Sequence, residues 1–187
     1  YRERVISRYN QKLQKMNHEL ERISKTDPLT KVANRYSLAD FFRQEVARKR
    51  RYHSNFSIIM VDLDHFKQVN DDYGHNAGDN VLSTVAKILS ENIRESDVVG
   101  RWGGEEFIML LNDCTAELAF KLINNLRLRF VQRQMGGLDI TASFGVSSIE
   151  SYPNSKSLEV CFKEADKAMY HAKENGRNRV EIFTKNL

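Results

Sequence analysis

Two short acidic segments carry the side chains in this sequence that are best suited to chemistry. The first, residues 101–107 (RWGGEEF), places two glycines and two adjacent glutamates between two apolar stretches. Paired glycines favour a tight hairpin and let a ligand approach the backbone without a Cβ in the way. Taken alone, the pattern also fits a solvated hairpin whose charges keep a sheet edge from pairing with another chain. The hairpin therefore becomes informative only beside the second segment.

The second segment is an apolar strand that ends in Asp62 and Asp64. Because alternate residues of a strand share a face, both carboxylates are expected on one side of the strand end. If this strand neighbours the hairpin, Asp62 and Glu105 converge on one point, and clustered carboxylate oxygens are ligands that Mg²⁺ prefers. A metal held there beside a triphosphate supplies the parts needed for phosphoryl or nucleotidyl transfer. For Asp64, capping of the turn that follows is an equal alternative to metal binding.

Predicted helices and strands alternate around these segments. Strand-length apolar runs predict strands at residues 56–63, 98–102, 107–111, 140–148 and 179–183, and longer patterns predict helices at residues 36–51, 77–92, 116–134 and 157–175. One two-glycine turn joins neighbouring strands, and the other connections are helical. The fold class that follows is α/β (α+β), with helices packed on a mixed sheet.

Residues 1–25 form a segment of different character, rich in charged side chains and free of Gly and Pro. Apolar residues recur at alternating spacings of three and four, which is a heptad seam. The seam residues are Ile6, Tyr9, Leu13, Met16, Leu20 and Ile23. Pro28 disfavours helix at Asp27 and ends the segment. We interpret residues 1–25 as a signalling helix in a parallel coiled-coil dimer and residues 26–187 as one catalytic domain; the alternative is an amphipathic helix packed on its own domain.

Composition is that of a folded domain, with 187 residues of which 41% are hydrophobic and 29% charged. No apolar run approaches the roughly 18 residues that cross a bilayer. Two cysteines, Cys114 and Cys161, are too few for a disulfide framework, so a cytoplasmic setting is expected. A net charge of +4 suits an anionic small ligand and does not indicate nucleic acid, although residues 48–51 (RKRR) raise that alternative. Because the chain starts at Tyr1, we expect a longer protein in which any membrane anchor lies upstream.

A series of blocks, in order and with consistent spacing over about residues 25–184, resembles the GGDEF-domain family of diguanylate cyclases. Glu105 stands where the family name has Asp. The matching blocks are Asp27-Pro28-Leu29-Thr30, Asn34-Arg35, Asp62-x-Asp64-x-Phe66-Lys67-x-x-Asn70-Asp71, Tyr73-Gly74-His75, Gly78-Asp79, residues 101–107, Ala142-Ser143-x-Gly145-Val146, and a closing stretch from Ala165 to Asn178.

The resemblance implies a mainly antiparallel sheet of the nucleotidyl-cyclase or polymerase-palm kind. It implies an enzyme that condenses two GTP into cyclic di-GMP and two pyrophosphates with two Mg²⁺ or Mn²⁺ ions per active site. Asp62 and Glu105 would coordinate the metal together with the Leu63 carbonyl. Glu106 would bind the second metal or assist proton transfer, and the resemblance does not decide which glutamate does which.

The resemblance also implies a set of GTP contacts. Asn70 and Asp79 would read the guanine, since a carboxylate can accept from its N–H groups and an amide can pair with the remaining edge. The residues implied to contact or make room for the phosphates are Phe66, Lys67, Gly103, Gly104, Lys173 and Arg177. Structural alternatives stay open: Asn70 fits a turn before Tyr73, and Lys173 suits the end of a helix through the helix dipole.

One domain of this kind holds one GTP, so the resemblance implies a homodimer in which two half-sites face each other, with the N-terminal helix as the dimer contact. Arg94 and Asp97 match the family's inhibitory Arg-x-x-Asp site for the product, with a second arginine from the region of Arg127 or Arg129. Two alternatives remain: a degenerate domain that only binds GTP or cyclic di-GMP, and a related cyclase that makes a mixed purine dinucleotide.

Overall fold

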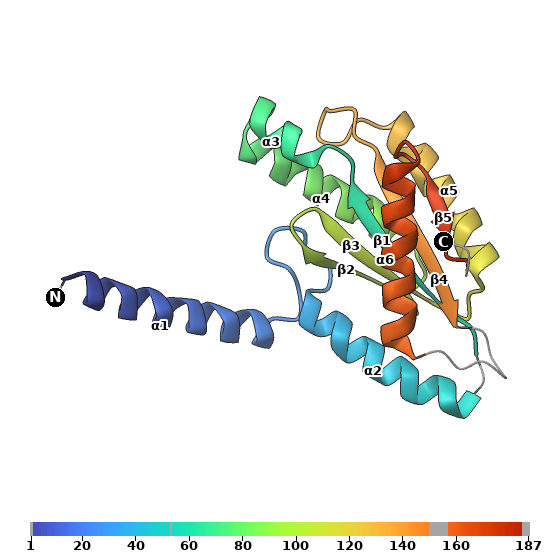
Figure 1. Ribbon diagram of the computed structural model, residues 1–187, viewed down its shortest axis with the longest axis horizontal. Coiled ribbons are helices and arrows are strands. Elements are labelled where there is room, and N and C mark those ends of the chain that lie inside the picture. Colours follow the sequence, from blue (N-terminus) through green and yellow to red (C-terminus); the bar gives the residue numbers. More distant parts are fainter. Residues whose placement is uncertain (1, 53, 150–156, 185–187) are drawn as a thin grey trace.

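The computed structural model describes residues 2–52, 54–149 and 157–184. Its elements in chain order are the helices and strands α1 (Arg2–Ile23), α2 (Arg35–Tyr52), β1 (Phe56–Leu63), α3 (Phe66–Tyr73), α4 (His75–Glu91), β2 (Val98–Gly103), β3 (Glu106–Asn112), α5 (Ala116–Gln132), β4 (Ala142–Ile149), α6 (Leu158–Glu174) and β5 (Val180–Ile182). Figure 1 shows α1 extending away from a body in which helices cover a twisted sheet.

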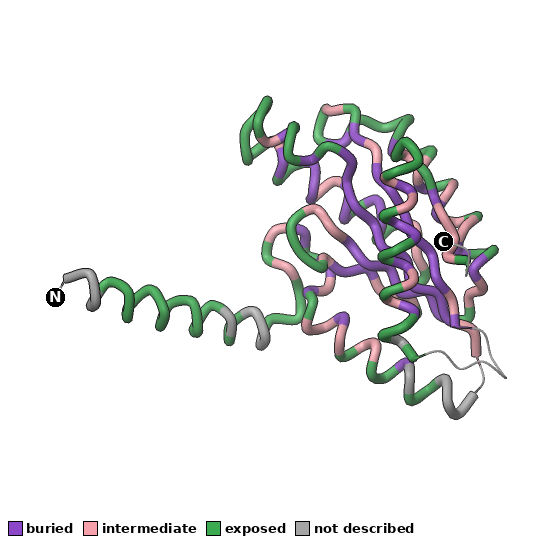
Figure 2. The backbone as a smooth tube through the Cα atoms, in the orientation of Figure 1, coloured by how far each residue is buried: buried purple, intermediate pink, exposed green. Residues whose placement is uncertain are grey.

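The five strands form one sheet in the order β2-β3-β1-β4-β5. The pairs β1–β3, β1–β4 and β2–β3 are antiparallel, and β4–β5 is parallel. The predicted mixed, mainly antiparallel sheet of the cyclase-palm kind is therefore confirmed. The central strand β1 is buried along its whole length, because it pairs with a strand on each edge and both faces of the sheet are covered (Figure 2).

Alternation along β1 divides the core into two layers. Ile59, Val61 and Leu63 belong to the layer formed with α3, α4 and α5. Phe56, Ile58 and Met60 belong to the layer formed with α2 and α6. Since Asp62 follows the even-numbered residues, it lies on the α6 side of the sheet, and it is the first residue of that series to be polar.

The helix α3 was not predicted. The sequence left open a turn at Asn70 as an alternative to guanine binding, but Asn70 lies within an eight-residue helix that packs on α4. Only Phe66 and Val69 of α3 are buried, so the segment lacks the longer apolar pattern by which helices are found in a sequence. The other predicted elements are present, with ends that differ by no more than two residues.

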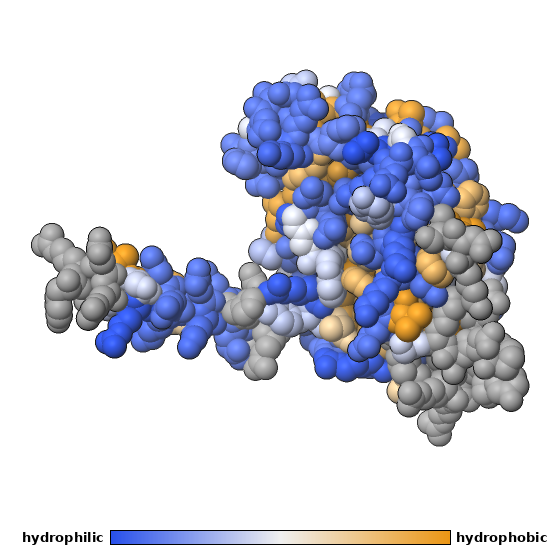
Figure 3. Space-filling view, viewed as in Figure 1, coloured by the Kyte–Doolittle hydropathy of each residue, from blue (hydrophilic) through white to orange (hydrophobic). Residues whose placement is uncertain are grey.

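The apolar side chains of α1 are exposed. Ile6, Tyr9, Leu13, Met16 and Leu20 are each 54–68% accessible, which argues against packing of this face on the rest of the described chain. The side chain of Ile23, the last predicted seam residue, lies outside the described residues. In Figure 3 most of the visible surface, including much of α1, is hydrophilic. None of the helices in the described ranges is long and apolar enough to span a membrane.

Candidate active site

The hairpin of residues 101–107 and the acidic end of β1 lie side by side. In the β1–β3 ladder Asp62 is directly opposite Glu106, and the Leu63 N–H donates to the Glu105 carbonyl at 3.4 Å. Gly104 turns the chain with φ +47°, a conformation that residues with a Cβ rarely adopt. The condition set by the sequence, that the strand should neighbour the hairpin, is therefore met.

A cation from α6 completes this group. The Nζ atom of Lys173 lies 2.7 Å from Oδ2 of Asp62, whose side chain is only 9% exposed. The helix can approach so closely because it crosses β4 at Gly145, where a Cβ would overlap the Ala165 carbonyl and the Met169 backbone. The absence of a side chain at Gly145 thus sets the position from which Lys173 reaches the strand end.

The carboxylates at this point affect one another. Burial raises the pKa of Asp62; Lys173 opposes the rise, and the charges of Glu105 and Asp64 add to it. Burial also raises the pKa of Glu106, with the negative charge of Asp62 as the next cause and those of Asp166 and Glu105 adding to it, while Lys173 opposes them. Burial is the main cause of both pKa shifts, and the neighbouring negative charges that add to them would favour a bound cation at this site.

Asp166, on the exposed side of α6, is the member of this charged group that sequence reasoning missed as a site residue. The sequence around Asp166 does not indicate a functional role, because the pattern of this block is that of the apolar core face of a helix. Only the placement of α6 across the sheet brings Asp166 near Glu106. Such long-range proximity has no counterpart in local sequence pattern.

The donors at the strand end are suited to a hard cation. Within the described ranges no group of three or more His, Cys, Asp or Glu side chains is arranged to hold a metal ion. Two carboxylates and a backbone carbonyl would fit Mg²⁺, which normally keeps several waters and takes further oxygens from a phosphate substrate. The chemistry of the site is therefore compatible with a metal bound jointly by protein and substrate, and not with a closed protein cage.

Asp64 serves the architecture. Its carboxylate accepts hydrogen bonds from the hydroxyls of Thr141 at 2.6 Å and Ser143 at 2.7 Å, and from the Asn178 N–H at 3.0 Å. These bonds join the end of β1 to β4 and to the turn after α6. Of the two alternatives left open by the sequence, the observed contacts of Asp64 are of the structural kind, although the partners lie far along the chain and not in the following turn.

Arg101 fixes the other side of the hairpin. Its guanidinium donates to the Gly104 carbonyl at 2.8 and 2.9 Å and lies 3.3 Å from Asp27 Oδ1. Asp27 also accepts from the N–H and hydroxyl of Thr30. Burial acts to raise the pKa of Asp27, but these hydrogen bonds and the Arg101 charge outweigh it and leave the pKa below its usual value. The segment that follows α1 is thereby bonded to the acidic hairpin.

The residues predicted to read guanine lie on α3 and α4. The Asn70 amide group packs over Gly78, where a Cβ would overlap its Oδ1, and Asp79 is the next residue of α4. Lys67 on α3 is exposed, as are Asp79 and Arg177, and within the described residues the side chains of these three form no hydrogen bond or ion pair. The structure thus gathers Asp62, Glu106 and Lys173 directly. Of the other predicted GTP contacts, Lys67, Asp79 and Arg177 are exposed, whereas Asn70 is half-buried and Phe66 is buried.

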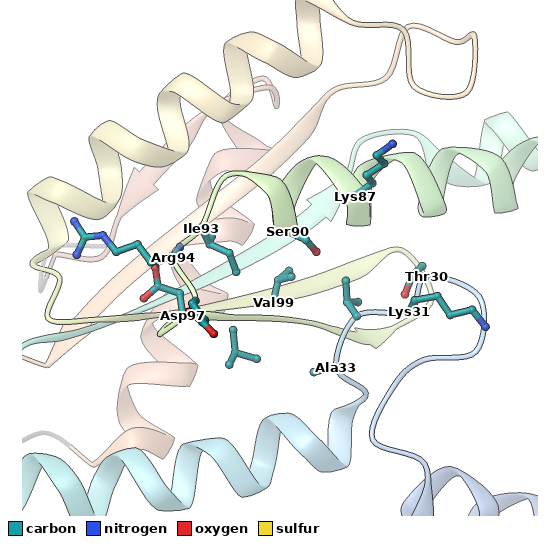
Figure 4. A pocket seen from close by; sticks show the side chains of 12 residues that line it. Thr30, Lys31, Ala33, Lys87, Ser90, Ile93, Arg94, Asp97 and Val99 are labelled. Atoms are coloured by element: carbon teal, nitrogen blue, oxygen red, sulfur yellow. Dashed lines mark hydrogen bonds between the residues drawn. The ribbon is translucent and has the colours of Figure 1, made fainter.

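Arg94 and Asp97 lie at the turn between α4 and β2. The Asp97 carboxylate accepts from the Arg94 N–H at 3.1 Å and from the Asn112 N–H at 2.9 Å, so it builds the turn. A pocket of about 580 Å³ separates this turn from residues 30–33, and Figure 4 shows the Arg94 and Lys31 side chains at its opposite ends. Arg129 donates to the Asn92 side chain beside the turn, whereas Arg127 donates to Asn178 at the turn after α6.

Comparisons with known proteins agree with the geometry. The chain matches the family described as diguanylate cyclase, GGDEF domain, over residues 24–179. Diguanylate cyclase DgcP of Pseudomonas aeruginosa is 39% identical over 161 residues, 84% of this chain and 24% of its own length. Diguanylate cyclase DosC of Escherichia coli is 36% identical over 166 residues, 86% of this chain and 35% of its own. The chain thus spans about a quarter to a third of the length of these relatives.

Two solved structures are similar over most of the chain. The coiled coil and GGDEF domain of DgcB from Caulobacter crescentus, in complex with c-di-GMP, gives a TM-score of 0.79 at 26% identity and covers 97% of each chain. The active GGEEF domain of a diguanylate cyclase from Vibrio cholerae gives 0.77 at 36% identity, covering 82% of this chain and 99% of that one.

Proposed function

The chain belongs to the diguanylate cyclase, GGDEF domain, family, and we propose that it condenses two molecules of GTP into cyclic di-GMP and two pyrophosphates. The observation that carries the proposal is the pairing of Asp62 with Glu106 across β1 and β3, with Lys173 at 2.7 Å from Asp62. This arrangement supplies carboxylates for a metal and a cation for a phosphate in one place. GTP as substrate also fits the cytoplasmic setting predicted from the cysteine content.

In each of the two steps, the ribose 3′-oxygen of one GTP forms a bond to the α-phosphorus of the other, and the bond to the leaving pyrophosphate breaks. The proton of the attacking hydroxyl goes to a base or to water. When bound, Mg²⁺ or Mn²⁺ would lower the pKa of that hydroxyl and offset charge on the leaving oxygens. Asp62, Glu105 and the Leu63 carbonyl would hold this metal, and Glu106 would either join them or take the proton.

The remaining residues of the proposal bind the nucleotide. Asn70 and Asp79 receive the guanine edge, where the close fit of Asn70 on Gly78 limits the directions in which the amide can point. Phe66 begins α3, whose first backbone amides are available to phosphate oxygens. Lys67, Lys173 and Arg177 supply positive charge, while the glycines at 103 and 104 let the triphosphate lie close to the hairpin.

Incubation with GTP and Mg²⁺, followed by chromatography for cyclic di-GMP and pyrophosphate, tests the proposal. Parallel reactions with ATP, alone and mixed with GTP, test whether a mixed purine dinucleotide forms. Binding of GTP without product, in a sample shown to be dimeric, would contradict the cyclase and favour the degenerate binding domain instead.

Two copies are required because each half-site holds one GTP. The exposed seam of α1 supports a parallel coiled coil as the dimer contact, since apolar side chains at heptad spacing gain stability when they are buried against a second helix. The solved DgcB structure, described as a coiled coil and GGDEF domain, is similar over 97% of this chain.

Replacing Leu13 with Ser at the seam should dissociate the dimer. Burying one leucine contributes about 1.5–3 kcal/mol, and the symmetric dimer loses two, so the dimer dissociation constant should rise by about two to four orders of magnitude. Sedimentation velocity over a concentration series measures this constant. Gln14→Ser, one residue away and off the seam, is the matched control, and equal effects of the two changes would contradict the coiled coil.

Product inhibition is proposed at the turn of Arg94. Arg94 is exposed and can pair with a guanine edge or stack on its face. Arg129, held beside this turn through Asn92, is the better placed of the two arginines considered as its partner. Asp97 shapes the site, because its carboxylate already accepts two backbone N–H groups.

Arg94→Ala should relieve inhibition by cyclic di-GMP, raising the inhibition constant about tenfold or more while kcat without product stays unchanged. The measurement is initial velocity at several product concentrations. Glu95→Gln removes a neighbouring exposed charge and serves as control. An inhibition curve that does not shift with Arg94→Ala would remove the regulatory site from the proposal.

A further inference from the structure

The turn after α6 has an unusual backbone. Gly176, Arg177 and Asn178 all have positive φ, with values of 106°, 60° and 45°. Glycine adopts such angles freely, but residues with a Cβ do so only at a cost in free energy. Two consecutive residues of this kind persist where surrounding contacts hold them in place. Arg177, a proposed phosphate contact, is the central residue of the turn.

Asn178 is held from two directions. From α5, the Nη1 atom of Arg127 donates to the Asn178 carbonyl at 3.3 Å and to its side-chain Oδ1 at 3.2 Å. From the end of β1, Asp64 Oδ2 accepts the Asn178 N–H at 3.0 Å. Arg127 is itself fixed, because its Nε donates to Asn124 Oδ1 at 3.0 Å one turn earlier on α5. The backbone N–H, the backbone carbonyl and the side-chain Oδ1 of Asn178 are therefore all hydrogen-bonded.

Arg177 is fixed in its backbone and free in its side chain. Its N–H donates to the Ala172 carbonyl at 2.9 Å, and within the described residues its guanidinium is exposed and forms no hydrogen bond or ion pair. It follows Lys173, which reaches Asp62, by four residues. A ligand that binds Arg177 must order a long side chain, and a backbone that is already ordered reduces this cost.

We propose that Arg127 is a positioning residue, which holds Asn178 from α5 and so presents the guanidinium of Arg177 to the triphosphate of GTP. The role rests on the proposed function, in which Arg177 contacts phosphate. Asp64 anchors the same turn, but it lies two residues from the proposed metal ligand Asp62. Arg127 is therefore the position at which the effect on Arg177 can be separated from an effect on the metal.

A double-mutant cycle tests this role. The variants are Arg127→Met, which keeps the apolar stem and removes the donors, Arg177→Met, and the two combined, with Arg127→Lys as the conservative variant. Binding of a GTP analogue with a methylene bridge between the α- and β-phosphorus is measured by calorimetry, and thermal unfolding is followed in parallel. The analogue cannot react, so binding is scored whether or not the parent protein makes cyclic di-GMP.

Arg127→Met alone should raise the dissociation constant of the analogue about fivefold, within the coupling expected inside one hydrogen-bonded network. KM for GTP should rise with it while kcat changes less than about twofold, and Arg127→Lys should recover part of the affinity. In the Arg177→Met background, Arg127→Met should weaken binding no further.

A fivefold loss that persists in the Arg177→Met background would overturn the role of Arg127, and so would unchanged affinity in Arg127→Met. If Arg177→Met binds the analogue as the parent does, the phosphate contact itself is wrong and the positioning role falls with it. Failure of the parent to convert GTP, with the binding cycle as expected, would instead count against the cyclase alone.

Discussion

Replacing Asp62 with Asn should abolish the proposed synthesis of cyclic di-GMP, lowering kcat by about three orders of magnitude. The substitution keeps the size of the side chain but takes one charge from the point where β1, the hairpin and α6 meet. Product formation from GTP, measured with Mg²⁺ and with Mn²⁺, gives the result. Asp113→Asn makes the same chemical change at an exposed turn residue with φ 47°, which Asn tolerates, and should leave kcat unchanged.

The same variant should retain its stability, which distinguishes loss of function from loss of fold. Burial raises the pKa of Asp62 in the folded state, so the folded protein binds this proton more tightly than the unfolded chain does. Above the folded-state pKa the ionised carboxylate therefore lowers the free energy of unfolding, and this cost disappears as the pH falls below the unfolded value, near 3.8. Asn carries no charge at any pH.

Urea unfolding without metal should accordingly show Asp62→Asn at least as stable as the parent at pH 7, with the difference shrinking toward pH 4. A variant that is much less stable at pH 7 would mean that the pair with Lys173 is a net stabilising contact. It would also mean that lost activity reflects a damaged fold. Lost activity with retained stability is the outcome that supports the proposed site.

Gly145→Ala should strongly destabilise the domain, although it adds only one methyl group. A Cβ at this position would overlap the Ala165 carbonyl and the Met169 amide, which are backbone atoms of α6 and cannot turn aside. Relief requires α6 to move off β4, at a cost of about 3 kcal/mol. For a domain of this size the midpoint of thermal unfolding should fall by about 6–12 °C.

The control is Gly103→Ala, where a Cβ meets nothing within 4 Å and φ is not positive. The midpoint of thermal unfolding of Gly103→Ala should change little, and the variant serves as a control for stability alone because Gly103 lies in the proposed active-site hairpin. Differential scanning calorimetry on both variants measures these midpoints. Equal midpoints for Gly145→Ala and the parent would show that α6 tolerates displacement from the sheet.

Local patterns were sufficient to predict the strands, whereas the mainly antiparallel sheet was implied by the resemblance to the GGDEF family. Periodicity located β1 to the residue, and the two-glycine turn correctly joined β2 to β3. The short helix α3 escaped prediction because a helix with only Phe66 and Val69 buried has too little apolar pattern to be recognised. Its stability comes from packing on α4, which is a tertiary effect that no window of sequence contains.

Sequence reasoning singled out the acids of the proposed site but not the contacts that connect them. Asp62 and the hairpin glutamates stand out because burying a charged side chain costs free energy, so carboxylates next to apolar strands indicate a functional role. The contacts of Lys173 with Asp62, of Asp64 with Asn178 and of Arg127 with Asn178 join residues far apart in the chain. Such contacts depend on which helix lies over which strand, and that arrangement is set by the packing of the whole core.

The bonds around Asp27 and Arg101 have a mechanical consequence. The segment between α1 and α2 is not a slack hinge: the Asn34 amide bonds the Ser24 carbonyl, Ala33 is hydrogen-bonded to both Val99 and Arg101, and the Arg101 guanidinium reaches the hairpin. The segment that links α1 to the domain is therefore held in place by hydrogen bonds to the domain. We therefore expect a rotation of α1 to reach the acidic hairpin through these hydrogen bonds.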